Sequence, residues 1–154
     1  MFVQSWESNW NEIFREIIFQ DAELKTLMKI PEGTNIITFR DKYFIHAGDA
    51  ASVLTDEPVR IIYGSVTTGS TGAPNVKSKE LSFDIYVKQP ELYNAERDRL
   101  VRRTTLIANR LADLLTKQRY IHGYRFWIEN DEDMTTRTIG YARRNISFGY
   151  MQVY

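Results

Sequence analysis

The amino-acid sequence predicts an α+β fold, with a mixed or antiparallel sheet of about four or five strands. A long helix and an N-terminal helix are expected to pack on one face of that sheet. Residues 79–88 alternate apolar and polar side chains, as in a strand with one buried face. Residues 92–118 instead carry apolar side chains at helical spacing. The length of 154 residues is typical of a single domain, spanning 1–154.

The N-terminal part is predicted to be helical. Apolar side chains recur three and four positions apart from Trp6 to Ile18, and Ser5 is the expected N-cap. A second, shorter helix is expected to begin at Asp21 and to end before Pro31.

The middle of the chain is predicted to be extended. Residues 36–45 are expected to form two short extended pieces around a turn at 40–42, followed by a polar linker. A strand over 59–66 comes next, and residues 67–78 join it to the strand over 79–88. This connection is a long hairpin loop, because such loops usually have about two to five residues.

The C-terminal part is predicted as a helix over 92–118, a strand over 124–129, a turn over 130–135 and a final strand over 137–154. Along the final strand the apolar residues change from odd to even positions. Such a change of phase predicts a β-bulge near residues 143–145.

The composition narrows the classes of function. The absence of cysteine excludes disulfides, thiolate metal sites and a cysteine nucleophile. The 20 basic and 20 acidic residues balance, which argues against a dedicated nucleic-acid binder. An acidic excess before residue 61 and a basic excess after it would suit head-to-tail stacking of copies, or is a chance feature. We see no secretory signal pattern, and no apolar run reaches the ~18 residues of a membrane span.

The stretch SVTTGSTGAPNVKS, residues 65–78, ends in Lys-Ser and could suggest a phosphate-binding loop. The pattern G-x-x-x-x-G-K-[ST] requires glycines where Thr71 and Val76 stand, and it requires a helix to follow. A strand is predicted there instead, so no helix N-terminus would receive an anion. We therefore expect an exposed hairpin loop, whose length suits contact with a partner subunit.

Two other groups could suggest chemistry. The carboxylates in Glu129–Asp133 could hold Mg²⁺ or Ca²⁺, but the calcium-loop spacing is absent and a solvated turn is the preferred interpretation. His46 and His122 stand without a second histidine or a nucleophile motif, so they are expected to be ordinary surface or core residues. The sequence thus predicts no catalytic residue, no metal ligand and no cofactor.

Arginines gather on the predicted long helix and at the final strand. They could pair with acidic groups of a neighbouring subunit, face a DNA backbone, or form a solvated face. These residues are Arg97, Arg99, Arg102, Arg103, Arg110, Arg143 and Arg144. Trp6 and Trp10 are expected in the core, with contact against a neighbouring subunit as the alternative.

The C-terminal two thirds of the chain resembles the tail-terminator and tail-completion (neck) proteins of tailed bacteriophages. The resemblance covers about residues 59–154 and rests on the order of four segments. These are VRIIYGSV followed by a long loop, ELSFDIYVKQ, RTTLIANRLADLL and ARRNISFGYMQVY.

The resemblance implies a structural virion protein rather than an enzyme. Such a subunit forms a ring, usually hexameric, which terminates the tail tube and joins it to the head connector. The implied partners are other copies of the chain, the tail tube protein and the head connector or adaptor proteins. Genomic DNA passes through the lumen without specific binding. The implied location is the virion, at the phage neck, after assembly in the host cytoplasm, with no membrane involved.

The expected interface residues come from the hairpin loop, the arginine surface and the N-terminal helix. They are Thr67, Thr68, Ser70, Thr71, Asn75, Lys77, Arg102, Arg103, Arg143, Arg144, Trp6 and Trp10. Within virion assembly, another head–tail joining protein or a tail-tube subunit is the alternative. Two alternatives of other classes are a small nucleic-acid-binding module that uses the helix arginines, and a nucleotide- or metal-dependent enzyme that uses Lys77 and the carboxylates of 129–133.

Overall fold

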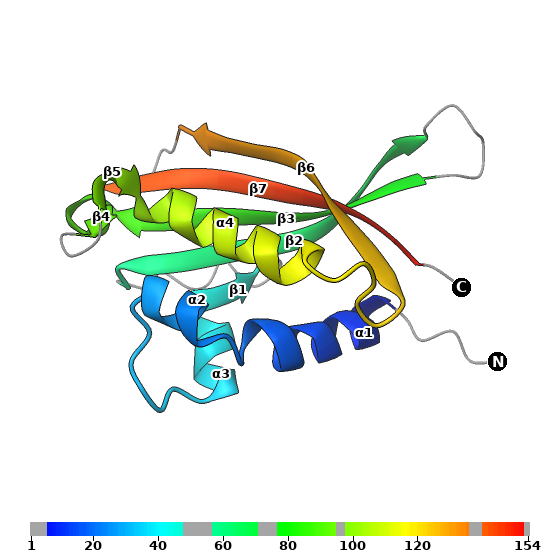
Figure 1. Cartoon of the computed structure of the whole chain (residues 1–154), viewed down its shortest axis with the longest axis horizontal. Helices are drawn as coiled ribbons and strands as arrows, with labels where there is room; N and C mark the ends of the chain where they lie inside the picture. Colours follow the sequence, from blue (N-terminus) through cyan, green and yellow to red (C-terminus); the bar gives the residue numbers. More distant parts are fainter. Residues whose placement is uncertain (1–5, 48–56, 71–76, 95–97, 136–139, 153–154) are drawn as a thin grey trace.

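The computed structural model describes residues 6–47, 57–70, 77–94, 98–135 and 140–152. The fold is α+β, as predicted, with helices packed against a five-stranded mixed sheet (Figure 1). Its helical elements are α1 Trp6–Ile13, η1 Phe14–Ile18, α2 Ala22–Leu27, α3 Ile36–Thr38, η2 Phe39–Tyr43, η4 Gln89–Glu91 and α4 Arg103–Thr116. Its strands are β1 Phe44–His46, β2 Val59–Ser70, β3 Lys77–Lys88, β4 Tyr93–Asn94, β5 Asp98–Arg102, β6 Tyr124–Met134 and β7 Tyr141–Gln152.

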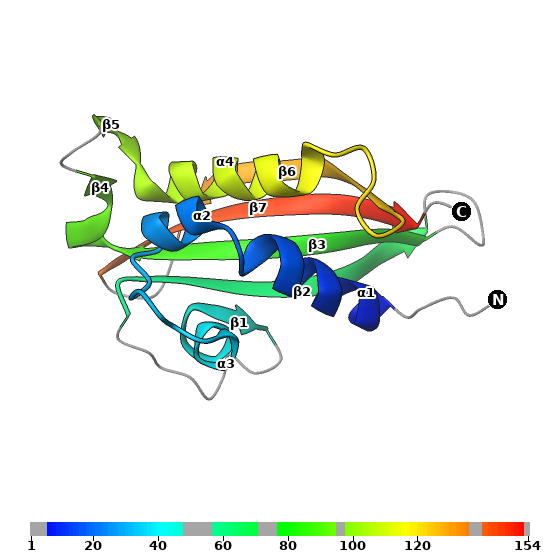
Figure 2. The same ribbon diagram turned by 60° about the horizontal axis from the view of Figure 1, so that its bottom comes forward.

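The sheet has the strand order β1-β2-β3-β7-β6. The β1 and β2 strands are parallel, and all other neighbours in this sheet are antiparallel. Figure 2 shows α1, α2 and α4 on the same face of the sheet. A separate two-stranded sheet, β4–β5, leads into α4. The prediction of helices on one face of a sheet is therefore confirmed.

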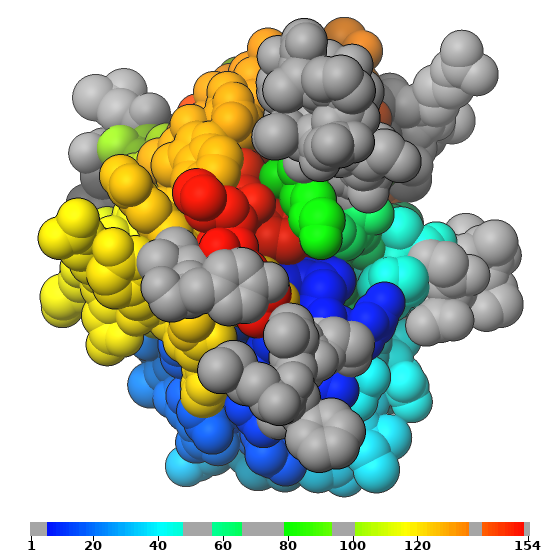
Figure 3. All heavy atoms as spheres, turned by 90° about the vertical axis from the view of Figure 1, so that its right-hand side faces the viewer, coloured from blue at the N-terminus to red at the C-terminus, as the bar shows by residue number. Residues whose placement is uncertain are grey.

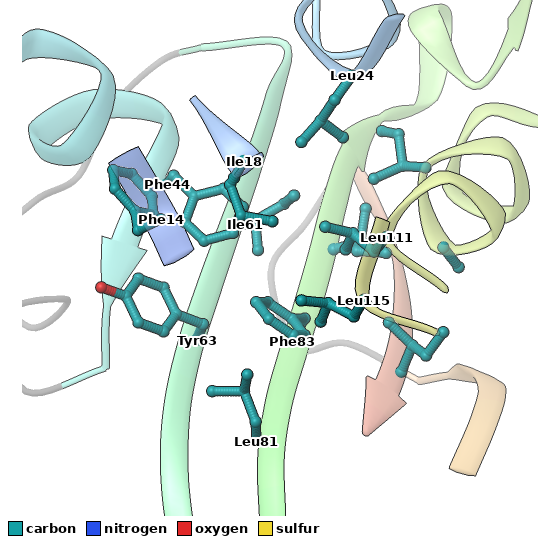
Figure 4. Close-up of a cluster of buried hydrophobic side chains, with 14 of the residues drawn as sticks. Phe14, Ile18, Leu24, Phe44, Ile61, Tyr63, Leu81, Phe83, Leu111 and Leu115 are labelled. Atoms are coloured by element: carbon teal, nitrogen blue, oxygen red, sulfur yellow. The ribbon is translucent and has the colours of Figure 1, made fainter. Parts of the chain in front are cut away.

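The core lies between that helical face and the alternating apolar residues of β2, β3 and β7. Phe83 is fully buried at its centre, and its ring contacts Trp10, Phe44, Tyr63 and Phe148. Figure 4 shows this core, with Leu111 and Leu115 of α4 beside β3 toward β7, and Phe14, Phe44 and Tyr63 toward β1 and β2. Every odd-numbered residue from Leu81 to Val87 is buried, as the alternation predicted.

The N-terminal helices follow the prediction. The helix from Trp6 to Ile18 is continuous, although its second half, η1, is wound as a π-helix. Asp21 caps α2, because its side chain accepts a hydrogen bond from the Leu24 N–H at 2.9 Å. The predicted cap Ser5 lies outside the described residues.

Residues 36–43 correct the prediction, because they form helical turns rather than extended pieces. The Asn35 side chain caps α3 by accepting a hydrogen bond from the Thr38 N–H at 2.8 Å. Phe39 and Tyr43 are then four positions apart on a helical surface, so both reach the core. Only Phe44–His46 is extended, as β1 beside β2.

The predicted long helix is also corrected, since α4 begins at Arg103 and not at residue 92. The segment before it forms η4 and the β4–β5 pair. A tertiary contact makes the difference: the buried Arg103 side chain donates to the carbonyl oxygens of Leu27 at 2.9 Å and Glu91 at 2.8 Å. Its own N–H bonds the Leu92 carbonyl at 2.6 Å, which turns the chain back on itself.

The C-terminal hairpin differs from the prediction in two ways. Residues 130–134 belong to β6 rather than to a turn, because carboxylates there pair with Arg144 on β7. The bulge lies in β6, between Ile128 and Asn130. Pairing of β3 with β7 runs without a shift, so β7 has no bulge at residues 143–145. Arg144 lies on the helix-facing side of β7, in line with Ile146 and Phe148. Because a polar residue stands at this position, the apolar residues of the sequence appeared to change from odd to even positions.

An ion pair joins α4 to the N-terminal helices. The Arg110 guanidinium donates to both carboxylate oxygens of Asp21, at 2.6 and 2.8 Å, and also lies 3.2 Å from Glu23. The hydrogen bond from Arg110 lowers the pKa of Asp21 below its usual 3.8, although burial opposes the shift. Glu23 is half exposed, so it contributes less to this contact.

We predict that Asp21→Asn lowers the free energy of unfolding by about 1–2 kcal/mol near pH 7, because it removes the charge but keeps a capping side chain. Since the pKa of Asp21 is lowered in the folded state, its contribution is present above pH 3.8 and is lost as the pH falls through the folded-state pKa. Urea unfolding of both proteins at several pH values measures this difference. Glu23→Gln is the control, and equal losses for the two variants would contradict the prediction.

Candidate assembly interface

The most prominent feature outside the core is an arm formed by β2 and β3. Pairing of β3 with β7 ends at Glu80 and Gly149, whereas β2 and β3 remain paired up to Ser70 and Lys77. Figure 1 shows this arm diverging from β7 at one end of the molecule. The predicted loop of residues 67–78 is therefore corrected: its two flanks are strands, and only residues 71–76 join them.

The arm contains most of the predicted loop contacts. Thr67, Thr68 and Ser70 lie in β2, and Lys77 is the first residue of β3. A register shift between Thr68 and Ser70 bends the arm locally. Thr71 and Asn75 lie outside the described residues. Because Lys77 and Ser78 start a strand, no helix N-terminus follows them, which supports rejection of the phosphate loop.

The predicted arginine surface is divided by the fold. Arg103 is buried and bonds carbonyl groups of its own chain, so its assignment to a subunit contact is corrected. Burial lowers the pKa of Arg103, while the charge of Glu91 opposes this. Arg110 is held by Asp21. Arg97 lies outside the described residues.

Arg143 and Arg144 point to opposite faces of β7. Arg144 faces the helices and lies 2.7 Å from Asp131 and 3.0 Å from Asp133. The pKa of Arg144 is raised: burial lowers it, but the hydrogen bonds that Arg144 donates to the two carboxylates, and their charges, outweigh that effect. Arg102 lies 3.6 Å from Asp133 at the exposed margin of the same cluster. The charges of Arg102 and Arg144 are therefore paired with carboxylates of the same subunit. The sequence alone did not indicate this pairing.

The other face of the sheet carries a row of polar side chains. Arg143 pairs with Asp84 at 2.9 Å. Asn145 donates to Asp84 at 3.0 Å and to Ser82 at 2.8 Å. The polar positions of the 79–88 alternation could have indicated this face, but their partners on β7 are about 60 residues away in sequence.

The two tryptophans of the N-terminal helix have different environments. Trp10 is 8% exposed and packs against Phe14, Tyr63 and Phe83, so it belongs to the core. Trp6 is partly exposed and stacks on Tyr150, with ring centroids 4.0 Å apart. Trp6 therefore offers surface at the end where α1 begins, whereas Trp10 offers little.

The histidines and carboxylates have structural partners. The His122 ring lies 2.8 Å from Glu16 and 3.5 Å from Glu12, and so joins the turn before β6 to the first helix. His46 ends β1, with its ring against Tyr63. Within the described residues, no three histidine or carboxylate side chains are grouped so that they could hold a metal ion.

Comparison of the sequence with protein-family models and with curated proteins found no match. Among the described helices, none is long and apolar enough to cross a membrane.

We predict that Arg144→Ala lowers the free energy of unfolding by about 1–3 kcal/mol, because two carboxylates lose a partly buried cation. The Arg144 side chain is 15% exposed, against 45% for Arg102. Arg102→Ala is therefore the control and is expected to change stability by less than about 0.5 kcal/mol. Chemical unfolding measures both variants, and a smaller loss for Arg144→Ala than for Arg102→Ala would exclude this ranking.

Gly149 of β7 packs against the Trp127 ring of β6, and substitution of this glycine tests that contact. A Cβ atom added there would lie 2.4 Å from the Trp127 ring, while one added at Gly64 would meet only Ala47 Cβ at 3.3 Å. We predict that Gly149→Ala costs about 1–3 kcal/mol of stability and Gly64→Ala less. Thermal unfolding measures both. In a Trp127→Ala background, Gly149→Ala should reduce stability by less than it does in the wild-type chain. An equal loss of stability in both backgrounds would show that the strain does not come from the Trp127 ring.

Proposed function

We propose that this chain is a structural virion protein that forms a ring at the neck of a tailed bacteriophage. The ring would terminate the tail tube and join the tail to the head connector. The observation that carries the proposal is the β2–β3 arm, which continues past the last pairing of β3 with β7. A paired arm of this kind costs little to order on contact, because its backbone is already hydrogen-bonded.

The sheet edges add to this support. The outer strands are β1 and β6, and β6 is eleven residues long. An outer strand presents backbone groups that can pair with another chain. Trp127 and Ile128 on β6, 36% and 50% exposed, add apolar surface there. A subunit with two different edges and a projecting arm suits head-to-tail contacts, which form a ring when the rotation between neighbouring subunits closes.

The alternatives from other classes are less favoured by the contacts of the charged residues. A nucleic-acid-binding module would need arginines free to reach phosphates. Arg103, Arg110, Arg143 and Arg144 instead bond groups of their own subunit. A metal-dependent enzyme would use the carboxylates of residues 129–133, but two of them are held by Arg144.

The proposed partners are other copies of the chain, the tail tube protein and the head connector or adaptor. Genomic DNA would pass through the lumen without specific binding. The proposed location is the virion, after assembly in the host cytoplasm. Another head–tail joining protein or a tail-tube subunit remains the neighbouring alternative, since both would use the same arm and edges.

The test is the state of assembly of the purified chain, alone and with tail tube protein. Light scattering and negative-stain microscopy are expected to detect a closed ring, hexameric as in the family that it resembles, and tubes that stop growing when the ring binds. A tail-tube subunit would instead form long tubes by itself. A chain that stays monomeric in both conditions would contradict the proposal.

We predict that replacing residues 71–76 by Asn-Gly leaves the fold intact but prevents ring formation. The two-residue turn closes a hairpin without strain, so the free energy of unfolding should change by less than about 1 kcal/mol. Light scattering measures ring formation and urea unfolding measures stability. A six-residue Gly-Ser replacement of the same segment is the control for length. Normal rings from the Asn-Gly variant would show that the tip is not used.

A further inference from the structure

The last strand of the sheet, β6, has one free side. In the strand order β1-β2-β3-β7-β6 it is outermost, and its pairing partner is β7. From Arg125 to Met134, no strand among the described residues pairs with its other side. That side therefore presents backbone N–H and carbonyl groups. A strand of another chain can add to such an edge and continue the sheet.

The second half of this edge is acidic. The stretch Glu-Asn-Asp-Glu-Asp holds four carboxylates, of which Asp131 and Asp133 pair with Arg144. Glu129 and Glu132 are exposed and form no ion pair within the described residues. Each accepts a hydrogen bond from a neutral side chain two positions away. The outer edge of β6 thus carries two negative charges that its own subunit does not balance.

The arm has a free edge of the opposite charge. Before Glu80, β3 has no partner on its β7 side, because the pairing of these strands ends at Gly149. Lys77 and Lys79 stand in this unpaired part of β3, and Lys79 is exposed without an ion pair among the described residues. Figure 3 looks onto this end of the molecule, where β3 in green lies beside the end of β7 in red. The arm therefore offers an open strand with a positive charge.

Charge favours the pairing of unlike edges over the pairing of like edges. Two β6 strands paired over their acidic stretches would bring carboxylates opposite one another, and two arms would bring lysines together. Pairing of an arm with β6 instead places Lys79 near Glu129 and Glu132. Repulsion within each like pair thus selects the unlike pair, as in other interfaces that discriminate by charge.

A subunit cannot make this contact with itself. Glu80 is level with Gly149 of β7, while Glu132 is level with Asn145. Four residues of β7 separate these two levels and Lys79 lies one residue further out, so Lys79 and Glu132 are roughly 17 Å apart along the sheet. Figure 1 shows the arm and the last part of β6 at opposite ends of the molecule. The partner is therefore a second copy.

We propose that the arm of one copy pairs along the outer edge of β6 of a second copy, with Lys79 beside Glu129 and Glu132. The inference rests on the proposed ring and names the two surfaces that meet in it. Because the surfaces differ and lie at opposite ends, each copy uses both, which is a head-to-tail contact. The ion pairs are at an exposed margin, so high salt should weaken the association.

Chemical cross-linking tests the contact in the unmodified chain. A carbodiimide joins a lysine amine to a carboxylate that touches it, without a spacer. In an equal mixture of unlabelled and ¹⁵N-labelled chains, links between copies give peptide pairs with one labelled member. Mass spectrometry should find such pairs between Lys77 or Lys79 and residues 129–133. Mixed pairs that are absent, or that join residues 129–133 to Lys42 beside β1, would overturn the inference.

Charge reversal tests the same contact in the ring. Lys79→Glu and Glu132→Lys should each weaken association of copies by at least about tenfold, and their combination in one chain should restore most of it. Lys117→Glu, at the end of α4, is the control and should have little effect. Light scattering measures association, and circular dichroism checks that each variant is folded.

The outcomes separate this inference from the proposed function. Rings that form equally well with Lys79→Glu, or a combined variant no better than the single ones, would overturn the inference and leave the function standing. A wild-type chain without rings would contradict the function, while the cross-links would still decide whether the arm meets β6. The replacement of residues 71–76 tests the tip of the arm and leaves this strand contact unchanged.

Discussion

The structure depends most on the burial of Phe83 in the middle of β3. Its ring contacts Trp10 of α1, Phe44 of β1, Tyr63 of β2 and Phe148 of β7. One side chain thus holds the first helix and three neighbouring strands in place, although these segments come from all parts of the chain. Aromatic rings supply this contact because each buries a large area and packs in a tilted or edge-to-face arrangement with its neighbours.

Arginines at inward positions form the second constraint. Arg103 ends the β4–β5 segment by bonding carbonyl groups from two other segments, and Arg144 extends β6 by pairing with its carboxylates. Buried charge is tolerated only where each cation has partners of its own. Because those partners lie in the same subunit, the charges that looked available for DNA or for a neighbour serve the fold.

Apart from the outer edge of β6, the surfaces that remain available for contacts with other molecules lie at one end of the subunit. The arm of β2 and β3, the exposed part of Trp6 and the cavity that Trp6 lines all lie where α1 begins and β7 ends. An arm that projects from one end of a subunit is an arrangement suited to repeated head-to-tail contacts. The proposed ring follows from this asymmetry.

The sequence by itself determined the α+β class, the helix over 6–18, the start of a second helix at Asp21 and the buried face of β3, because local periodicity and helix-start signals encode these features. Only the tertiary structure decided where α4 begins, that residues 36–43 are helical and that residues 130–134 continue a strand. The start of α4 and the extension of β6 depend on partners outside the segment itself, Leu27 for Arg103 and Arg144 for Asp131. The helical turns of residues 36–43 have a local cap, and they place Phe39 and Tyr43 in the core. For the candidate site, sequence located the hairpin and the tryptophans. The cavity between them exists only once α1 packs against β2 and β3, so no local pattern could predict it.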